Sequence, residues 1–270
     1  MKITISKINE LRKLTGIGIM ECKKALTKSN GNIKQAIFFL KKIGNKISIN
    51  LTKNKMNEGA LVSSVKNDNS FGTIIGISCE TDFLSRNKDF LNFLFDLSKK
   101  SLSYHSKIDF INSRYDNKET INEVINYKIG IFKERIEIKI FEIIKAPYVI
   151  HYTHNHKISA LVGFSKKIDK SIAKNIAMHV VAMNPISISE NDFPEKILNE
   201  EKNIIKQQVE NEKKPHKILQ KIICGRINKL ILNNTLLNQL FIKDNKITIN
   251  EYIKKYENNL KILSFKRLII

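Results

Sequence analysis

Apolar residues recur at helical spacing through the first 44 residues of the chain. The first helix places Ile8, Leu11 and Leu14 on one face, which predicts a buried stripe. Asn32 can cap a third helix, because its side chain can accept from backbone N–H groups at a helix start. Glycines mark the breaks between the helices and the end of the third one: Gly16, Gly18, Gly31 and Gly44. We predict a three-helix docking module over residues 1–44 and a basic linker over residues 45–57.

After the linker, apolar and polar residues alternate with a period of two, which is typical of β-strands. The segments GALVSSVK and FGTIIGISC are rich in β-branched residues and flank the turn NDNS, which predicts a hairpin. A helix should follow from a cap at Asn87, with Phe90, Leu94 and Leu97 on its buried face. These elements make up the first predicted subdomain, residues 58–134.

The same order of hairpin and helix recurs over residues 136–184. The strand pattern RIEIKIFEII precedes a second hairpin, formed by YVIHYT and SALVGFS. Asp169 can cap the following helix, which Pro185 ends. A short helix, INEYIKKY, and a final strand complete the chain. We therefore predict an α+β fold with two related subdomains, the second spanning residues 135–270.

A charged helical segment is inserted into the second subdomain at residues 192–233. Pro215 divides it into two helices, and each helix carries an apolar seam. The first seam comprises Ile197, Ile204, Ile205 and Val209, and the second comprises Leu219, Ile222, Ile223, Ile227 and Leu230. Two facing seams predict an antiparallel helical hairpin, an exposed arm of the kind that serves association.

The chain has 47 basic and 26 acidic residues, a net charge of +21, which raises the question of a polyanionic partner. Such a field attracts polyanions or acidic partners. However, only six of the basic residues are arginines, whose planar fork suits phosphates and bases. The chain has no tryptophan, and most phenylalanines fall on predicted apolar stripes rather than where bases would stack. This pattern favours a compositional bias toward lysine on solvated faces, and we expect no direct binding of nucleic acid.

Motifs for chemistry are absent from the sequence. It has no GxxxxGK[ST] loop for phosphates, no GxSxG elbow and no CxxC pair. His151, His154 and His156 cluster on a predicted turn without neighbouring carboxylates or cysteines, so we expect no metal there. His179 lies on an apolar helix and is expected to be a buried, hydrogen-bonded histidine. We expect a protein that is not an enzyme, needs no cofactor, does not enter a membrane and is cytoplasmic.

Four stretches resemble one protein family, in one order along nearly the whole chain. The segment TGIGIMECKKAL is similar to the pattern T-G-A-G-M-M-D-C-K-K-A-L, and TDFLSRN to T-D-F-V-A-[KR]-N. The segment NIAMHVVAMNP is similar to H-I-A-M-H-V-A-A-x-x-P, and KPHKILQKIICGRINK to K-P-x-x-I-x-x-K-M-V-x-G-R-M-x-K. By these motifs the chain is identified as a member of the bacterial elongation factor Ts family. The family catalyses guanine-nucleotide exchange on the GTPase elongation factor Tu.

The resemblance implies a ubiquitin-associated-like module, a core of two subdomains and a coiled-coil arm. It also implies that the T-D-F-V turn enters the GTPase and displaces magnesium and GDP. The matching residues are Thr81, Asp82, Phe83 and Leu84. Without the resemblance, a phenylalanine between a strand and a helix is better explained by a ring tucked into the core. The family pattern favours an outward-pointing wedge instead.

Three further positions match family residues that dock on the GTPase. Ile19 and Met20 match paired methionines of the first module, and His154 matches a hairpin histidine. Ile19 keeps an apolar contact but lacks the adaptability of methionine. A homodimer through the core or the arm is left open, and the alternative function is that of a basic ribosome- or RNA-associated structural protein.

Overall fold

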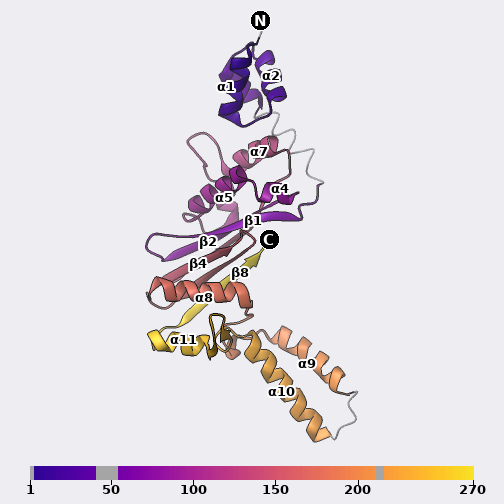
Figure 1. Ribbon diagram of the computed structural model, residues 1–270, viewed down its shortest axis with the longest axis vertical. Coiled ribbons are helices and arrows are strands. Elements are labelled where there is room, and N and C mark those ends of the chain that lie inside the picture. Colours follow the sequence, from indigo (N-terminus) through magenta and orange to yellow (C-terminus); the bar gives the residue numbers. More distant parts are fainter. Residues whose placement is uncertain (1–2, 41–53, 211–215) are drawn as a thin grey trace. The chain divides into compact units, whose positions relative to one another are not determined.

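The computed structural model describes residues 3–40, 54–210 and 216–270. Its helices and strands, labelled in Figure 1, fit the predicted α+β class. Two compact units emerge: Met1–Val62 with Ile75–Phe141 and Ile270, and Ser63–Ile74 with Glu142–Ile269. Both units use segments that are distant in sequence, so the subdomain bounds expected from the sequence stay a prediction.

The N-terminal helices of the first unit form where the apolar spacing places them. They are α1 (Ile5–Thr15), α2 (Ile19–Lys28) and a helical segment over residues 33–40. Gly16 ends α1 with a φ of 71°, a left-handed conformation that glycine adopts without strain. Ile8 and Leu11 are buried as predicted, whereas the prediction for Leu14 is wrong, because its side chain is 63% exposed. The expected helix end at Gly44 and linker residues 45–53 lie outside the described residues.

A three-stranded sheet in the order β1-β2-β3 follows. Its strands are β1 (Glu58–Val65), β2 (Phe71–Cys79) and β3 (Glu137–Lys145). Every residue of β2 is buried, as expected for a central strand. We expected β3 with the second hairpin, but it lies next to β2 in the first sheet. Strand pairing over such a separation leaves no local sequence pattern, which explains the difference.

Four helices of the first unit follow in sequence. They are α4 (Asp82–Ser85), α5 (Lys88–Ser101), α6 (Lys107–Asn112) and α7 (Ile121–Phe132). Asn87 caps α5 as predicted, accepting from the backbone N–H of Asp89 at 2.8 Å. Phe90, Leu94 and Leu97 are buried in the core of this unit, also as predicted. The helices α6 and α7 were not among the elements expected from the sequence.

The second unit contains an antiparallel sheet in the order β4-β5-β8. Its strands are β4 (Tyr148–His154), β5 (Ile158–Phe164) and β8 (Ile262–Ile269). Helix α8 (Lys170–Met183) packs on β4 and β5, with Asp169 as its cap. Smaller elements complete the unit: a 3₁₀ turn (Glu190–Asp192), β6 (Leu240–Phe241), β7 (Asp244–Thr248) and α11 (Ile249–Tyr256).

The predicted arm consists of α9 (Glu195–Glu210) and α10 (His216–Asn234), an antiparallel pair in Figure 1. Ile205 and Val209 of the first seam are buried, but Ile204 is 46% exposed, so its assignment to that seam is wrong. Adjacent residues on a helix point about 100° apart, so Ile204 and Ile205 cannot both face α10. The second seam is half-buried throughout. Among the described residues, no helix is both long and apolar enough to cross a membrane.

Candidate partner-binding site

The residues Thr81–Leu84 comprise the cap and the first residues of α4, a single helical turn that follows β2. Thr81 caps this turn, because its Oγ1 accepts from the backbone N–H of Leu84 at 3.3 Å. Leu84 points into the core and is 6% exposed, whereas Phe83 is 85% exposed. The predicted outward exposure of Phe83 is therefore confirmed. Among the large apolar side chains of the described residues, Phe83 is the most exposed, which makes the turn a candidate binding element.

The carboxylate of Glu134, which is distant from this turn in the sequence, holds the turn through hydrogen bonds. Glu134 Oε2 accepts from the backbone N–H groups of Glu80 at 3.1 Å and Thr81 at 3.0 Å. Its Oε1 accepts from the hydroxyl of Thr81 at 2.5 Å. Cys79 adds a fourth constraint, since its thiol donates to the carbonyl of Thr81 at 3.3 Å. The base of the turn is thus fixed through backbone, hydroxyl and carbonyl groups together.

The Glu80 side chain in turn binds the segment that carries Glu134. Its Oε1 accepts from the backbone N–H of Arg135 at 2.6 Å, and its Oε2 accepts from the Asn54 amide at 2.9 Å. Each glutamate therefore receives a backbone N–H from the other segment. We name the residues Glu80, Thr81, Glu134 and Arg135 the turn clamp. No sequence motif points to Glu134 or Glu80 as part of this site, because no local pattern joins positions 54 residues apart.

Asp82 lies beside Phe83 and carries the charge of the turn. Its carboxylate is 3.5 Å from the guanidinium of Arg86, with side-chain exposures of 46% and 78%. Exposed pairs of this kind contribute little to stability. The carboxylate of Asp82 is therefore available to groups of a partner at small cost.

Ile19 and Met20 begin helix α2 and are 47% and 60% exposed. Both are apolar side chains on the surface of the N-terminal helices, consistent with docking. They are carried by a different element from the Phe83 turn, so binding through both would use two separate contacts.

His154 lies at the end of β4 in the second unit and lines a pocket of about 350 Å³. Its Nδ1 is 3.2 Å from the Tyr152 hydroxyl. The remaining lining is mostly apolar with two basic side chains: Ile158, Met178, Val181, Ala182, Ile242, Lys243 and Arg267. A mostly apolar lining with a few polar groups is typical of a ligand-binding pocket.

The other histidine of the β4 strand and the helix histidine are structural. Ser63 Oγ is 2.9 Å from Nδ1 of His151, and burial lowers the pKa of this imidazole, with Lys170 and Lys174 adding to the shift. His179 is fully buried, as predicted, and both of its ring nitrogens have partners. Among the described residues, no group of three potential metal ligands comes together.

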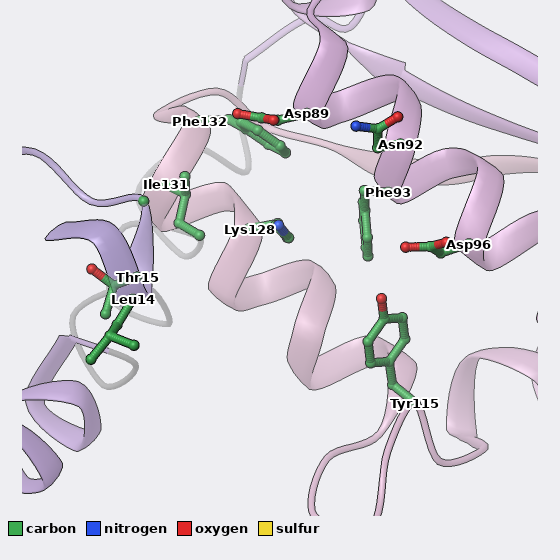
Figure 2. Close-up of a pocket in the computed structure, with 11 residues that line it drawn as sticks. Leu14, Thr15, Asp89, Asn92, Phe93, Asp96, Tyr115, Lys128, Ile131 and Phe132 are labelled. Carbon is green, nitrogen blue, oxygen red and sulfur yellow. The ribbon is translucent and has the colours of Figure 1, made fainter. Parts of the chain in front are cut away.

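A second pocket, of about 330 Å³, lies in the first unit and is lined by the end of α1 and by α5 and α7 (Figure 2). The Lys128 ammonium is 5.4 Å from the ring centre of Phe93 and 5.7 Å from that of Phe132. Burial lowers the pKa of Lys128, and the carboxylates of Asp89 and Asp96 oppose that shift. The charged groups of this pocket thus offset one another, and we assign it no part in binding.

Comparison with known sequences places these features in a family. The sequence model described as Elongation factor TS matches residues 80–270, and a UBA-like domain matches residues 6–41. Elongation factor Ts of Christiangramia forsetii is 36% identical over 100% of this chain and 99% of its own length. The proteins of the same name from Flavobacterium psychrophilum and Azobacteroides pseudotrichonymphae are 35% and 34% identical, over 98% and 99% of this chain and 97% and 98% of their own lengths. The chain therefore belongs to the Elongation factor Ts family of translation elongation factors.

Proposed function

We propose that this protein binds elongation factor Tu in its GDP form and promotes exchange of GDP for GTP. The observation that carries the proposal is the 85% exposure of Phe83 on a turn that the clamp fixes. Family membership supports the same function. Exchange of this kind breaks no covalent bond in the GTPase, so the protein acts as an exchange factor rather than an enzyme.

An exchange factor works by differential binding. It must bind the nucleotide-free GTPase more tightly than the nucleotide-bound form, and by linkage it then weakens nucleotide by the same factor. A ten-thousandfold weakening requires about 5.5 kcal/mol of differential binding free energy. Buried aromatic anchors at interfaces contribute about 2–4 kcal/mol each, so one inserted ring supplies a substantial part.

Phe83 is the inserted ring in this proposal. The side chain leaves water on insertion, and its binding free energy is gained only when the partner's nucleotide site opens. Asp82 accompanies the ring and competes for the donors around magnesium, so both magnesium and GDP are displaced. Thr81 and Leu84 hold the turn, one through its hydroxyl and the other through its place in the core.

Docking away from the nucleotide site supplies the rest of the affinity. Ile19 and Met20 offer an apolar surface on the N-terminal helices, and the His154 pocket offers a recess on the second unit. We propose both as contacts with elongation factor Tu. Such contacts bind the nucleotide-bound and nucleotide-free forms alike, so they bring the wedge to its site without driving exchange.

The arm and the sheets complete the proposed architecture. We infer that the two sheets with their helices are related subdomains, because a hairpin followed by a helix occurs in each. We leave open a homodimer through the core or through the arm, and a dimer through the arm would cover the exposed Ile204, Ile218 and Leu232. We place this translation factor in the cytoplasm, without direct contact to nucleic acid or membrane.

The test uses elongation factor Tu loaded with fluorescent GDP. Adding this protein with excess unlabelled GDP should accelerate the loss of fluorescence. Acceleration that saturates with concentration would support the proposal, whereas release at the spontaneous rate would overturn it. Repeating the experiment at several salt concentrations excludes the alternative, since binding to RNA weakens steeply with salt.

A further inference from the structure

We propose that Glu134 is a positioning residue for exchange, which acts by holding the Phe83 turn in its inserting conformation. The inference rests on the proposed function of Phe83. Glu134 does not itself need to touch elongation factor Tu. It lies just beyond the end of α7, and the turn it holds lies at the end of β2.

The position of Glu134 depends on the end of α7. Lys133 closes that helix in the left-handed conformation, with a φ of 58°, and its N–H donates to the Ile129 carbonyl at 2.8 Å. The chain changes direction at this residue, and Glu134 follows immediately. Its carboxylate then meets two consecutive backbone N–H groups, those of Glu80 and Thr81. Consecutive N–H groups that converge on one oxygen form a geometry that suits an anion.

A carboxylate is suited to this position by its number of acceptors. One oxygen takes the two backbone N–H groups and the other takes the Thr81 hydroxyl. That hydroxyl donates its hydrogen to Glu134 and still accepts from the N–H of Leu84, so it transmits the restraint into the turn. Hydrogen bonds to a charged acceptor are stronger than neutral ones. Glu134 is partly buried, so water competes only weakly for these donors.

The consequence for exchange is preorganisation. Phe83 is exposed and does not belong to the core cluster of the described residues, so the backbone of its turn must set the direction of the ring. A turn that had to become ordered during insertion would lose part of the binding free energy to conformational entropy. The clamp removes that loss before the partner arrives. Glu134 should therefore affect exchange only as long as Phe83 is present.

The experiment uses full-length protein with Glu134→Ala and Glu134→Gln. Glutamine keeps an oxygen for the two backbone N–H groups but cannot accept from the Thr81 hydroxyl. The matched control is Asp96→Asn, which removes one exposed carboxylate of the same unit away from the turn clamp. Thr81→Val breaks the clamp in a second way, because it deletes the hydroxyl that donates to Glu134 and leaves Glu134 in place.

Amide hydrogen exchange measures the clamp directly. We expect the amides of Glu80 and Thr81 to exchange about tenfold faster in Glu134→Ala, and less so in Glu134→Gln, since hydrogen bonds to a charged acceptor are lost. The core amides of β2 should exchange at the parent rate in the Glu134 variants. In Asp96→Asn, all of these amides, including those of Glu80 and Thr81, should exchange at the parent rate. Unchanged protection of Glu80 and Thr81 in Glu134→Ala would overturn the proposal.

Release of fluorescent GDP from elongation factor Tu measures the consequence. We expect about tenfold slower stimulated release with Glu134→Ala, about threefold with Glu134→Gln and Thr81→Val, and no change with Asp96→Asn. In a Phe83→Ala background, Glu134→Ala should change the rate by less than about twofold, because the group it positions is gone. An equally large effect in both backgrounds would mean a general structural role and would overturn the proposal.

The two proposals fail in different ways. If Phe83→Ala releases GDP at the parent rate, the proposed function of the wedge fails, whatever the amides of the clamp show. If Phe83→Ala is slow but Glu134→Ala releases GDP at the parent rate, the wedge stands and the positioning role of Glu134 is wrong.

Discussion

Phe83 and Leu84 are neighbours on one helical turn, yet Phe83 is 85% exposed and Leu84 only 6%. Phe83 is the side chain that we propose to bind the partner, and its neighbour Leu84 is part of the core. Leu84→Ala should lower the free energy of unfolding by about 2–5 kcal/mol, because it leaves a cavity in the core. Phe83→Ala should change it by no more than about 0.5 kcal/mol. Urea unfolding of both variants checks this, and equal destabilisation would mean that Phe83 is a core residue.

Asp82 should contribute less to exchange than Phe83. Asp82→Ala removes a charge and leaves the ring, so we expect stimulated GDP release to slow by about threefold. Its exposed ion pair with Arg86 contributes little, so stability should not change measurably. Arg86→Ala serves as the control, since it removes the same ion pair without removing the carboxylate. An equal loss of exchange in both variants would assign the effect to the ion pair rather than to Asp82.

Only some of the residues in these predictions could be recognised as important from the sequence. Local patterns located Asn87, Asp169 and the buried stripe of α5, because capping and helical spacing act between residues a few positions apart. The residues around Phe83 favoured a ring tucked into the core, and only the family motif favoured the exposure that the structure shows. The resemblance to that motif also gave Phe83 a role that spacing alone could not supply.

The long-range relationships were beyond such patterns. Glu134 meets Thr81 from 53 residues away, and β3 joins the first sheet although it precedes the second hairpin. Leu14 has the correct spacing for a buried stripe, but the core of the N-terminal helices forms from other residues. Spacing fixes which face of a helix is apolar, and only the packing of neighbouring elements decides how much of that face is covered.

The buried His179 should make stability depend on pH. Nδ1 accepts from the Ile242 N–H at 3.2 Å, so Nε2 carries the hydrogen and donates to Gln239 at 3.1 Å. Burial lowers the pKa of His179 below its ordinary value of 6.5, although the bond to Gln239 opposes the shift. Below about pH 6.5 the unfolded chain therefore binds more protons than the folded protein, and stability falls as the pH falls.

Thermal unfolding at pH 7.5 and pH 5.5 checks this dependence. His179→Asn should unfold at a lower temperature than the parent at pH 7.5, because it loses the bond to Gln239. Its unfolding temperature should also change less between the two pH values, because this titrating group is gone. His151 is shifted in the same direction and leaves some dependence behind. A dependence in His179→Asn as steep as in the parent would contradict the prediction.

Deleting residues 1–44 should weaken partner binding and leave the remainder folded. The N-terminal helices have their own core, against which only Tyr127 and Ile131 of α7 pack among the described apolar residues outside residues 1–44, and the core of α5 and the first sheet is a separate cluster. The deletion exposes Tyr127, whose hydroxyl donates to the Thr15 carbonyl at 3.3 Å, and this should cost only modest stability. Circular dichroism and binding to elongation factor Tu check both parts. An unfolded remainder would show that these residues are not a docking module.

Replacing the arm, α9 and α10, by a short loop should reduce association. Ile204, Ile218 and Leu232 of the arm are between 45% and 47% exposed, so the contact between its two helices leaves apolar surface uncovered. Light scattering should give a lower mass for the armless protein, or its complex with elongation factor Tu should be weaker. An unchanged mass together with full affinity for elongation factor Tu would show that the arm has no role in association.

The most direct test of the central claim is stimulated GDP release by Phe83→Ala. The parent, Phe83→Ala and Asp82→Ala are mixed in turn with elongation factor Tu carrying fluorescent GDP, and the release rate is followed at saturating concentration of each. If Phe83 is the wedge, its loss costs about 2 kcal/mol of differential binding, and release slows about thirtyfold while the protein remains as stable as the parent. Release by Phe83→Ala at the parent rate would contradict the account.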